Sequence, residues 1–163
     1  MDTVESGLRK AVDAATPRLL ALSEAEAARR PAAGKWSPKE VLGHLVDSAS
    51  NNHQRFVRAQ FTEDLVFPGY RQEAWVAAQD YQAAPWPDLV GLWRLFNLHL
   101  ARVIEAIPPA VRQRPRARHN LHEIAWKTVP EDRPSTLEYF MRDYVDHLEH
   151  HLSQIPRPGG DRG

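Results

Sequence analysis

The chain has 163 residues, of which 42% are hydrophobic, enough for one ordinary core but short for two comfortable domains. Lys plus Arg and Asp plus Glu both count 21, so no overall basic field favours a nucleic-acid partner. There is no cysteine, which excludes disulfides, thiolate metal ligands and a cysteine nucleophile. Any metal must therefore be held by His, Asp, Glu or water.

The chain has the pattern of a single cytoplasmic domain. No stretch of about 18 apolar residues appears, and the charged, amphipathic N-terminus lacks the apolar core of a signal peptide. We therefore expect a cytoplasmic protein without a membrane partner. We expect one domain over residues 1–163, in which residues 156–163 form a flexible tail.

The first helical segment begins near Val4 and runs toward Arg30, with apolar residues three and four positions apart. Pro17 lies inside this segment and should kink it, because proline lacks the N–H that a helix interior needs. Ser23 and Glu26 have the spacing of a capping box, which could begin a separate short turn. The residues leave open whether this helix is continuous.

The second helical segment opens at the letters WSPKEVLGHL. Ser37 is a good N-cap, Pro38 suits the first helical position, and Glu40 completes a capping box. We expect this helix to continue to about Phe61. A loop that contains proline and glycine follows, with one turn of helix around residues 72–78.

The third helical segment carries a wide apolar stripe that begins at Pro87 and ends at Ile107, before two prolines. Residues 108–134 contain five prolines and predict a long crossover, in which only the letters LHEIAW suggest an ordered piece. The arginines of this segment alternate without aromatic neighbours. That pattern is typical of a solvated loop rather than of a nucleic-acid-binding arm.

The last helical segment begins at the letters STLE, Ser135 to Glu138, which form another S-x-x-E capping box. We expect it to end near Ile155, ahead of two prolines. Four amphipathic helices, one long crossover before the last helix and no strand pattern predict an all-α four-helix bundle. The cores of such bundles commonly hold metal sites.

The last helix carries three histidines within five positions, in the letters DHLEHHL. Because each residue turns the side chain by about 100°, His151 lies about 40° from His147, and both face the apolar arc or its edge. His150 points about 60° to the other side, among solvated residues. Two imidazoles four positions apart can bind one divalent ion. The alternative is that both are ordinary histidines at the edge of the core.

A metal centre needs a third ligand, and the second helix offers His44 and His53, which lie about 180° apart. Ser48, Asn51 and Arg55 lie within about 40° of His44 and form a polar stripe with it. Serine and asparagine are poor choices for a plain helix surface, and a site explains them. An ordinary solvent-facing stripe has the same pattern, so the residues alone leave that alternative open.

Four stretches carry a wider resemblance: KWSPKEVLGHLVDSASNNHQRF, TED, YRQEAW and YVDHLEHHLSQI. Together they resemble the DinB-like superfamily and, within it, the bacillithiol S-transferase-like branch, whose members are described as metal-dependent hydrolases. The resemblance implies an up-down-down-up bundle and one divalent metal, zinc or nickel, held by His44, His147 and His151. The chain departs from the pattern at Ala49, where related sequences often have another histidine.

The resemblance also implies an activity. We expect a metal-dependent enzyme that conjugates a low-molecular-weight thiol to a small electrophile, as a thiol S-transferase. One alternative is a hydrolase that uses a metal-activated water, and another is a non-catalytic metal- or ligand-binding stress-response bundle. Small-molecule thiols and electrophiles are the expected partners, with no nucleic acid. Similar proteins are often homodimers, and the apolar surface of the first and third helices is compatible with that state.

Three polar residues of the second helix are candidates for supporting roles. Asn51 and Arg55 could orient a substrate or neutralise an anionic cofactor, because arginine offers a fixed fork of donors for carboxylates. Asp47 could orient a ligand histidine. A surface ion pair is the competing interpretation of Arg55. The sequence assigns no role to five other histidines: His53, His99, His119, His122 and His150.

Overall fold

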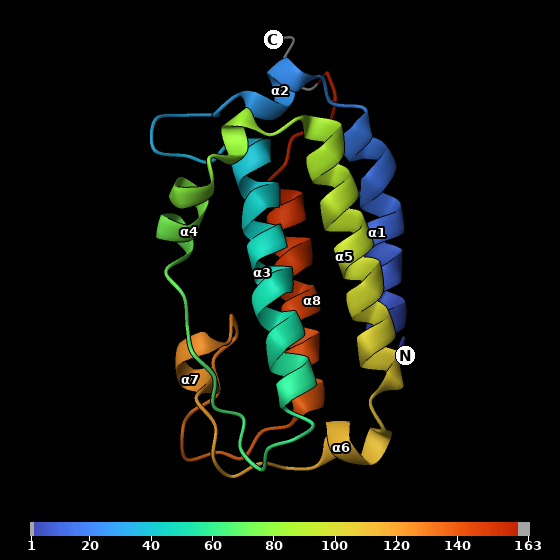
Figure 1. Cartoon of the computed structure of the whole chain (residues 1–163), viewed down its shortest axis with the longest axis vertical. Coiled ribbons are helices and arrows are strands. Elements are labelled where there is room, and N and C mark those ends of the chain that lie inside the picture. Colours follow the sequence, from blue (N-terminus) through green and yellow to red (C-terminus); the bar gives the residue numbers. More distant parts are fainter. Residues whose placement is uncertain (1, 160–163) are drawn as a thin grey trace.

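Four long helices form a bundle in the computed structural model, which describes residues 2–159 (Figure 1). They are α1 (Val4–Leu20), α3 (Pro38–Arg58), α5 (Trp86–Ala106) and α8 (Leu137–Ser153). α1 and α8 run in one direction and α3 and α5 in the other, so the order is up, down, down, up (Figure 1). The predicted all-α four-helix bundle is confirmed.

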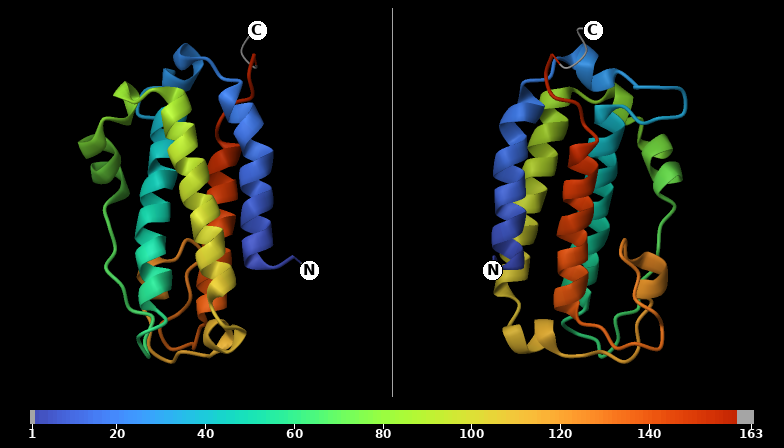
Figure 2. Two further views of the ribbon diagram at one scale, coloured as in Figure 1. Left: turned by 45° about the vertical axis from the view of Figure 1, so that its right-hand side comes forward. Right: turned by 180° about the vertical axis from the view of Figure 1, so that it is seen from behind.

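Two long connections join the helices. Because α3 and α5 run the same way, residues 59–85 return along the outside of α3, as both views of Figure 2 show. This return segment holds α4 (Gln72–Gln79) and a short 3₁₀ helix, η1 (Tyr81–Ala83). The crossover before the last helix holds α6 (Pro109–Gln113) and α7 (Leu121–Ile124). Residues 2–159 contain no β-strand, only two isolated β-bridges.

The first predicted helix is divided in two. α1 ends at Leu20, three residues after Pro17, and a separate helix, α2 (Glu24–Ala28), follows. Ser23 and Glu26 form a complete capping box at the start of α2, in which each side chain bonds the other residue's backbone N–H. The short capped turn is therefore confirmed, and the continuous helix to Arg30 is wrong because a new N-cap begins inside it.

The start of α3 follows the sequence prediction closely. Ser37 accepts a hydrogen bond from the Glu40 amide, the Glu40 side chain accepts one from the Ser37 amide, and Pro38 occupies the first turn. The helix ends at Arg58, slightly before the expected Phe61. α4 begins at Gln72 as predicted and is stopped by Asp80, whose φ of 47° is left-handed.

The start of α8 differs from the prediction. The N-cap is Thr136, whose side chain accepts from the Tyr139 amide at 3.0 Å, so the expected Ser135–Glu138 capping box is wrong. The reason is a tertiary contact. The backbone of Ser135 exchanges two hydrogen bonds with the backbone of Arg116 in the crossover, at 2.7 and 3.1 Å, and is held outside the helix.

α3 lies at the centre of the fold and is buried on more than its apolar side. It packs against α5 and α8, while α4 and η1 cover another part of its surface. As a result every residue from Pro38 to Ala49 is buried, polar ones included. The interpretation of the His44 stripe as a solvent-facing surface is therefore wrong. The reason is that the return segment covers this stripe.

The last helix ends at Ser153, slightly before the expected Ile155. Residues 156–159 are exposed, and residues 160–163 of the predicted tail lie outside the described residues. None of the helices between residues 2 and 159 combines the length and the apolar character that crossing a bilayer requires.

Candidate metal centre

Three histidines from two helices meet near the α2 end of the bundle. His44 comes from α3, and His147 and His151 come from α8. One nitrogen from each ring can be chosen so that all three lie within 4.8 Å of one another, and the Nε2 atoms of His44 and His147 are 3.3 Å apart. The structure thus brings together the three residues that the sequence singled out.

Burial keeps these imidazoles neutral. Desolvation by burial, together with a smaller effect of neighbouring imidazoles, lowers the pKa of His44 to about 4 and that of His147 to about 3. The pKa of His151 is lowered as well, again mainly by burial. A histidine must be neutral to offer a lone pair to a metal, so the three rings are in the ligand form at neutral pH.

The nitrogen positions fit a divalent cation. A 3.3 Å approach between two Nε2 atoms is satisfied without a cation only if one ring donates a proton to the other. The Nδ1 atom of His44 is buried and has no hydrogen-bond partner among the described residues. An all-imidazole set suits zinc, nickel, copper or iron. A cation among the three rings would use the lone pairs that face one another.

A glutamine orients one of the three rings. Nδ1 of His151 donates to the side-chain oxygen of Gln154 at 2.9 Å. With the proton on Nδ1, the lone pair of Nε2 is available on the other side of the ring. Gln154 therefore lies where a residue that orients a metal-binding histidine by a hydrogen bond is expected. Sequence reasoning missed it, although it lies three residues after His151 at the end of α8.

Asp47 has a different contact from the one expected. Its Oδ1 accepts from the Tyr81 hydroxyl at 2.6 Å and from the Gln79 amide at 2.8 Å, and it forms no hydrogen bond to His44. Its Oδ2 is buried without a partner within residues 2–159, and burial raises the pKa of this carboxyl group. Asp47 thus fastens the segment after α4 to α3, and the expected bond to a ligand histidine is absent.

A glycine makes this attachment possible. A Cβ on Gly43 would lie 2.1 Å from Cδ2 of Tyr81, closer than any real contact. The Tyr81 ring therefore lies directly against the α3 backbone, next to His44 in sequence, and its hydroxyl reaches Asp47. Position 43 must be glycine for the return segment to cover the histidine side of α3 in this way.

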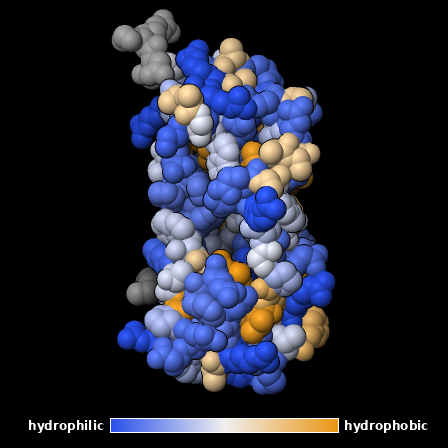
Figure 3. Space-filling model, turned by 90° about the vertical axis from the view of Figure 1, so that its left-hand side faces the viewer, coloured by the Kyte–Doolittle hydropathy of each residue, from blue (hydrophilic) through white to orange (hydrophobic). Residues whose placement is uncertain are grey.

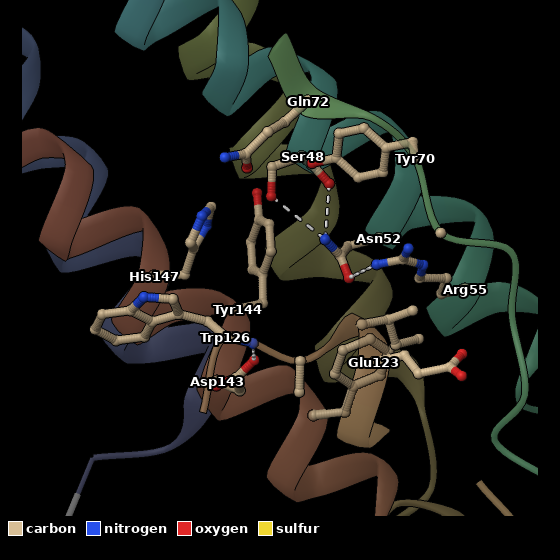
Figure 4. Close-up of a pocket in the computed structure, with 14 residues that line it drawn as sticks. Ser48, Asn52, Arg55, Tyr70, Gln72, Glu123, Trp126, Asp143, Tyr144 and His147 are labelled. Atoms are coloured by element: carbon tan, nitrogen blue, oxygen red, sulfur yellow. Dashed lines mark hydrogen bonds between the residues drawn. The ribbon is translucent and has the colours of Figure 1, made fainter. Parts of the chain in front are cut away.

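A cavity of about 260 Å³ adjoins the cluster at His147. Its deep wall consists of buried side chains from α3 and α8, including Asn52, Arg55 and Tyr144 (Figure 4). Its rim includes exposed residues from the two connections, Gln72 and Trp126. Figure 3 shows the face of the molecule that carries α4 and α7, which is hollowed at mid-height. The cavity therefore opens to solvent between these two helices.

The two candidates for substrate contact both border a hollow near Phe67, but only Arg55 also reaches the cavity at His147. Arg55 lines the cavity, is only 6% exposed, and forms no ion pair in the part of the chain that the structure describes. The competing interpretation of a surface ion pair is therefore wrong. Asn51 does not line this cavity; its side chain bonds the Asp47 carbonyl at 2.9 Å and borders the hollow near Phe67.

Several cavity residues were not identified from the sequence. Asn52 is buried beside Arg55, and its neighbour Asn51 was chosen instead. Asn52 lies about 80° from His44, inside the apolar arc of α3, and a polar residue there is the signal that could have indicated it. Tyr70 comes from the first long connection, where no periodicity places a side chain. Asp143 accepts from the backbone amides of residues 126 and 127 at 2.8 and 2.7 Å and holds the second connection against α8.

The remaining histidines have other surroundings. His150 stacks on Trp126 with the ring centroids 5.0 Å apart. His119 is buried in the crossover, where it contacts the Arg133 carbonyl at 2.6 Å. His53 and His99 form a pair between α3 and α5, with ring centroids 5.3 Å apart. Within residues 2–159, the three-histidine cluster alone brings three potential metal-binding residues together.

The fold and the cluster define a class of proteins: up-down-down-up four-helix bundles with three histidines from two of the helices gathered at one cavity. The family model described as the DinB superfamily matches residues 8–155. The chain belongs to this superfamily, as the resemblance implied.

A solved structure has the same architecture. It is that of YfiT from Bacillus subtilis, described as "a probable metal-dependent hydrolase with an unusual four-helix bundle topology". YfiT is 20% identical to this chain, with a TM-score of 0.75, and the match covers 93% of this chain and 81% of the YfiT chain. At this identity the likeness establishes the fold. No curated protein matches the chain.

Proposed function

We propose that this protein is a divalent-metal-dependent enzyme that transfers a small thiol to an electrophile. The observation that carries the proposal is the cluster itself: three neutral imidazoles whose nitrogens lie within 4.8 Å of one another, beside a cavity that opens to solvent. Three protein ligands with a free position are the usual arrangement of a catalytic zinc-type centre, whereas a structural centre has a fourth protein ligand.

The ligand set supports an open centre. No carboxylate joins the three histidines as a ligand among the described residues. Asp47 of α3 is bonded to Tyr81 and Gln79 instead, and Glu73 of α4 acts on His44 only through its charge. Three neutral ligands leave the charge of a divalent ion uncompensated. Such an ion supplies a Lewis acid that lowers the pKa of a thiol or a water molecule bound to it.

The pKa of the reacting group favours thiol over water. A free thiol has a pKa of about 8.5, so a small shift ionises it at neutral pH, whereas bulk water at about 15.7 needs a much larger one. In the transfer, a sulfur–carbon bond forms as the leaving group departs, and the thiol proton passes to solvent.

Hydrolysis is the second candidate. YfiT, which shares this architecture, is described as a probable metal-dependent hydrolase. A zinc ion held by three histidines would also lower the pKa of a bound water, to about 7. The two candidates differ in whether turnover needs a thiol.

The test compares the wild-type protein, purified with its metal, with His147→Ala and with His53→Ala as the matched control. Each is assayed with a small thiol plus an aryl halide, and separately with ester and amide substrates in the absence of thiol. We expect thiol conjugation by the wild type and by His53→Ala, and its loss in His147→Ala. Ester or amide cleavage without thiol would instead establish the hydrolase. A protein that keeps its metal and catalyses neither reaction would overturn both in favour of a binding protein.

A further inference from the structure

We propose that Arg55 binds the carboxylate of a ligand that occupies the cavity. The other end of the same ligand reaches the histidine cluster. This inference rests on the proposed function, since it names a chemical feature of the molecule that the same site accepts. The inference depends on the surroundings of the buried guanidinium group of Arg55.

Arg55 is a buried cation without a counter-ion. The residue is 6% exposed, and no acidic group lies within ion-pair distance among residues 2–159. A buried charge without a partner is costly, because it has lost its hydration and gained little in return. The desolvation is large enough to lower the pKa of this guanidinium. A charge that is maintained in such a place indicates an anionic ligand.

The guanidinium is fixed in place, with donors to spare. It donates to the Pro68 carbonyl at 2.9 Å and, more weakly, to Asn52 Oδ1 at 3.4 Å. Two of its five N–H donors are thus used by described residues. The rings of Tyr70 and Phe140 lie 5.9 and 5.8 Å from its central carbon and limit its rotation. The other donors have no partner among the described residues, and Arg55 lines this cavity as well as the hollow near Phe67.

The position of Arg55 sets the length of the molecule. In Figure 4, Arg55 and His147 lie on opposite sides of the pocket, with Tyr144 and Asn52 between them. Phe140, which contacts Arg55, precedes His147 by seven residues on α8, about 10 Å at a rise of about 1.5 Å per residue. A ligand that joins the two ends therefore carries its carboxylate about 10 Å from the group at the cluster.

The charges around the cavity favour a carboxylate over a phosphate. Arg55 is the one cationic side chain among the described residues that line it, and the planar guanidinium fork matches a carboxylate in a bidentate pair. Two acidic residues also line it. Asp143 accepts two backbone hydrogen bonds near Trp126, on the His147 side, and Glu123 is exposed at the rim. A phosphate monoester, with nearly two charges, would meet a single cation here.

The test uses two pairs of probes and calorimetry. On the metal-loaded protein, 6-sulfanylhexanoate is compared with 6-sulfanylhexanamide, which differ only in the charge at one end. On the metal-free protein, hexanoate is compared with hexanamide. We expect the wild type to bind the carboxylate of each pair at least about 10-fold more tightly, since a charge-assisted bidentate pair is a strong interaction.

Three variants assign that preference to a residue. Arg55→Met should lose it, Arg55→Lys should keep part of it, and Arg58→Met, one turn along α3 and exposed, should keep all of it. Equal binding of carboxylate and amide by the wild type would overturn the proposal, as would a preference that survives in both Arg55 variants. The hexanoate pair needs no metal, so a protein that fails to bind metal would refute the proposed function without deciding this one.

Discussion

The bundle holds two groups of neighbouring histidines, and only one of them has the features of a metal centre. His44, His147 and His151 come from α3 and α8, and His53 and His99 come from α3 and α5. The centroid distances are similar, 4.5 to 5.2 Å in the first group and 5.3 Å in the second. Proximity of rings therefore does not distinguish the two groups.

The difference lies in burial, in the third donor and in access. In the first group His44 is 1% exposed, a third ring converges, and a cavity begins at His147. In the second group His99 is exposed, and no third potential ligand joins the pair within residues 2–159. His44 and His53 lie on opposite sides of α3. The three histidines that converge on one point therefore lie on one side of this helix, and the His53–His99 pair lies on the other.

The largest expected effect is on metal binding. His44→Ala removes one of three ligands, and we expect it to weaken zinc binding by more than the roughly 10- to 100-fold that loss of an outer partner costs. His53→Ala changes the same residue type on the other side of α3 and should leave the affinity unchanged. Competition titration with a chelating dye measures both. Equal loss in the two variants would mean that the distinction between the groups is mistaken.

The next effect is on acid stability of the metal-free protein. The folded-state pKa of His44 is about 4, below the usual 6.5, so between these values the unfolded chain binds more protons than the folded one. The free energy of unfolding therefore falls as the pH drops from 6.5 toward 4, by up to roughly 3 kcal/mol for this residue. Above about pH 6.5 this histidine does not contribute to the change of the unfolding free energy with pH.

Urea unfolding at a series of pH values measures the effect. His44→Gln should lose stability less steeply in that window than the wild type, while His53→Ala should retain most of the slope. A wild-type protein whose stability is flat from pH 6.5 to 4 would contradict the burial of the cluster.

A smaller effect on stability is expected where the return segment, residues 59–85, packs over the histidine side of α3. Gly43→Ala places a methyl group 2.1 Å from Tyr81, and overpacking of this kind costs about 1 to 3 kcal/mol. Gly91→Ala, on α5, meets no atom within 4 Å and should stabilise the protein by about 0.5 to 1 kcal/mol. Chemical denaturation of the two variants gives the comparison. Similar changes in both would show that Tyr81 does not lie against α3.

The smallest expected effect is at the outer partner of the cluster. Gln154→Ala removes the acceptor that orients His151 and should weaken zinc binding about 10-fold, while leaving three ligands in place. Ser153→Ala, at the neighbouring position and exposed, is the control. The same dye titration measures the zinc affinity of both variants. An unchanged affinity in Gln154→Ala would show that Gln154 does not orient His151 for metal binding.

Much of the helical framework could be predicted because its signals are local. The capping boxes at Ser23 and Ser37 depend on residues three positions apart, and both form as expected. The box at Ser135 fails for a reason that no local pattern contains, since its backbone pairs with Arg116 far away in the sequence.

The candidate site could be predicted only in part for the same reason. Angles around α3 and α8 favoured His44, His147 and His151, and the resemblance to the DinB-like superfamily implied all three as metal ligands. The angles could not distinguish a buried polar stripe from an exposed one, because burial depends on the return segment that covers α3. The cavity residues Tyr70 and Trp126 come from the long connections, whose paths depend on contacts such as the one between Tyr81 and Asp47.

The most direct test of the proposed metal centre is a crystal structure of the zinc-loaded protein with anomalous data collected at the zinc edge. We predict one strong peak, bound by a nitrogen of His44, His147 and His151 at about 2.0 to 2.1 Å, with its remaining position facing the cavity. A zinc ion bound at His53 and His99 instead, or one that leaves His44 uncoordinated, would contradict it.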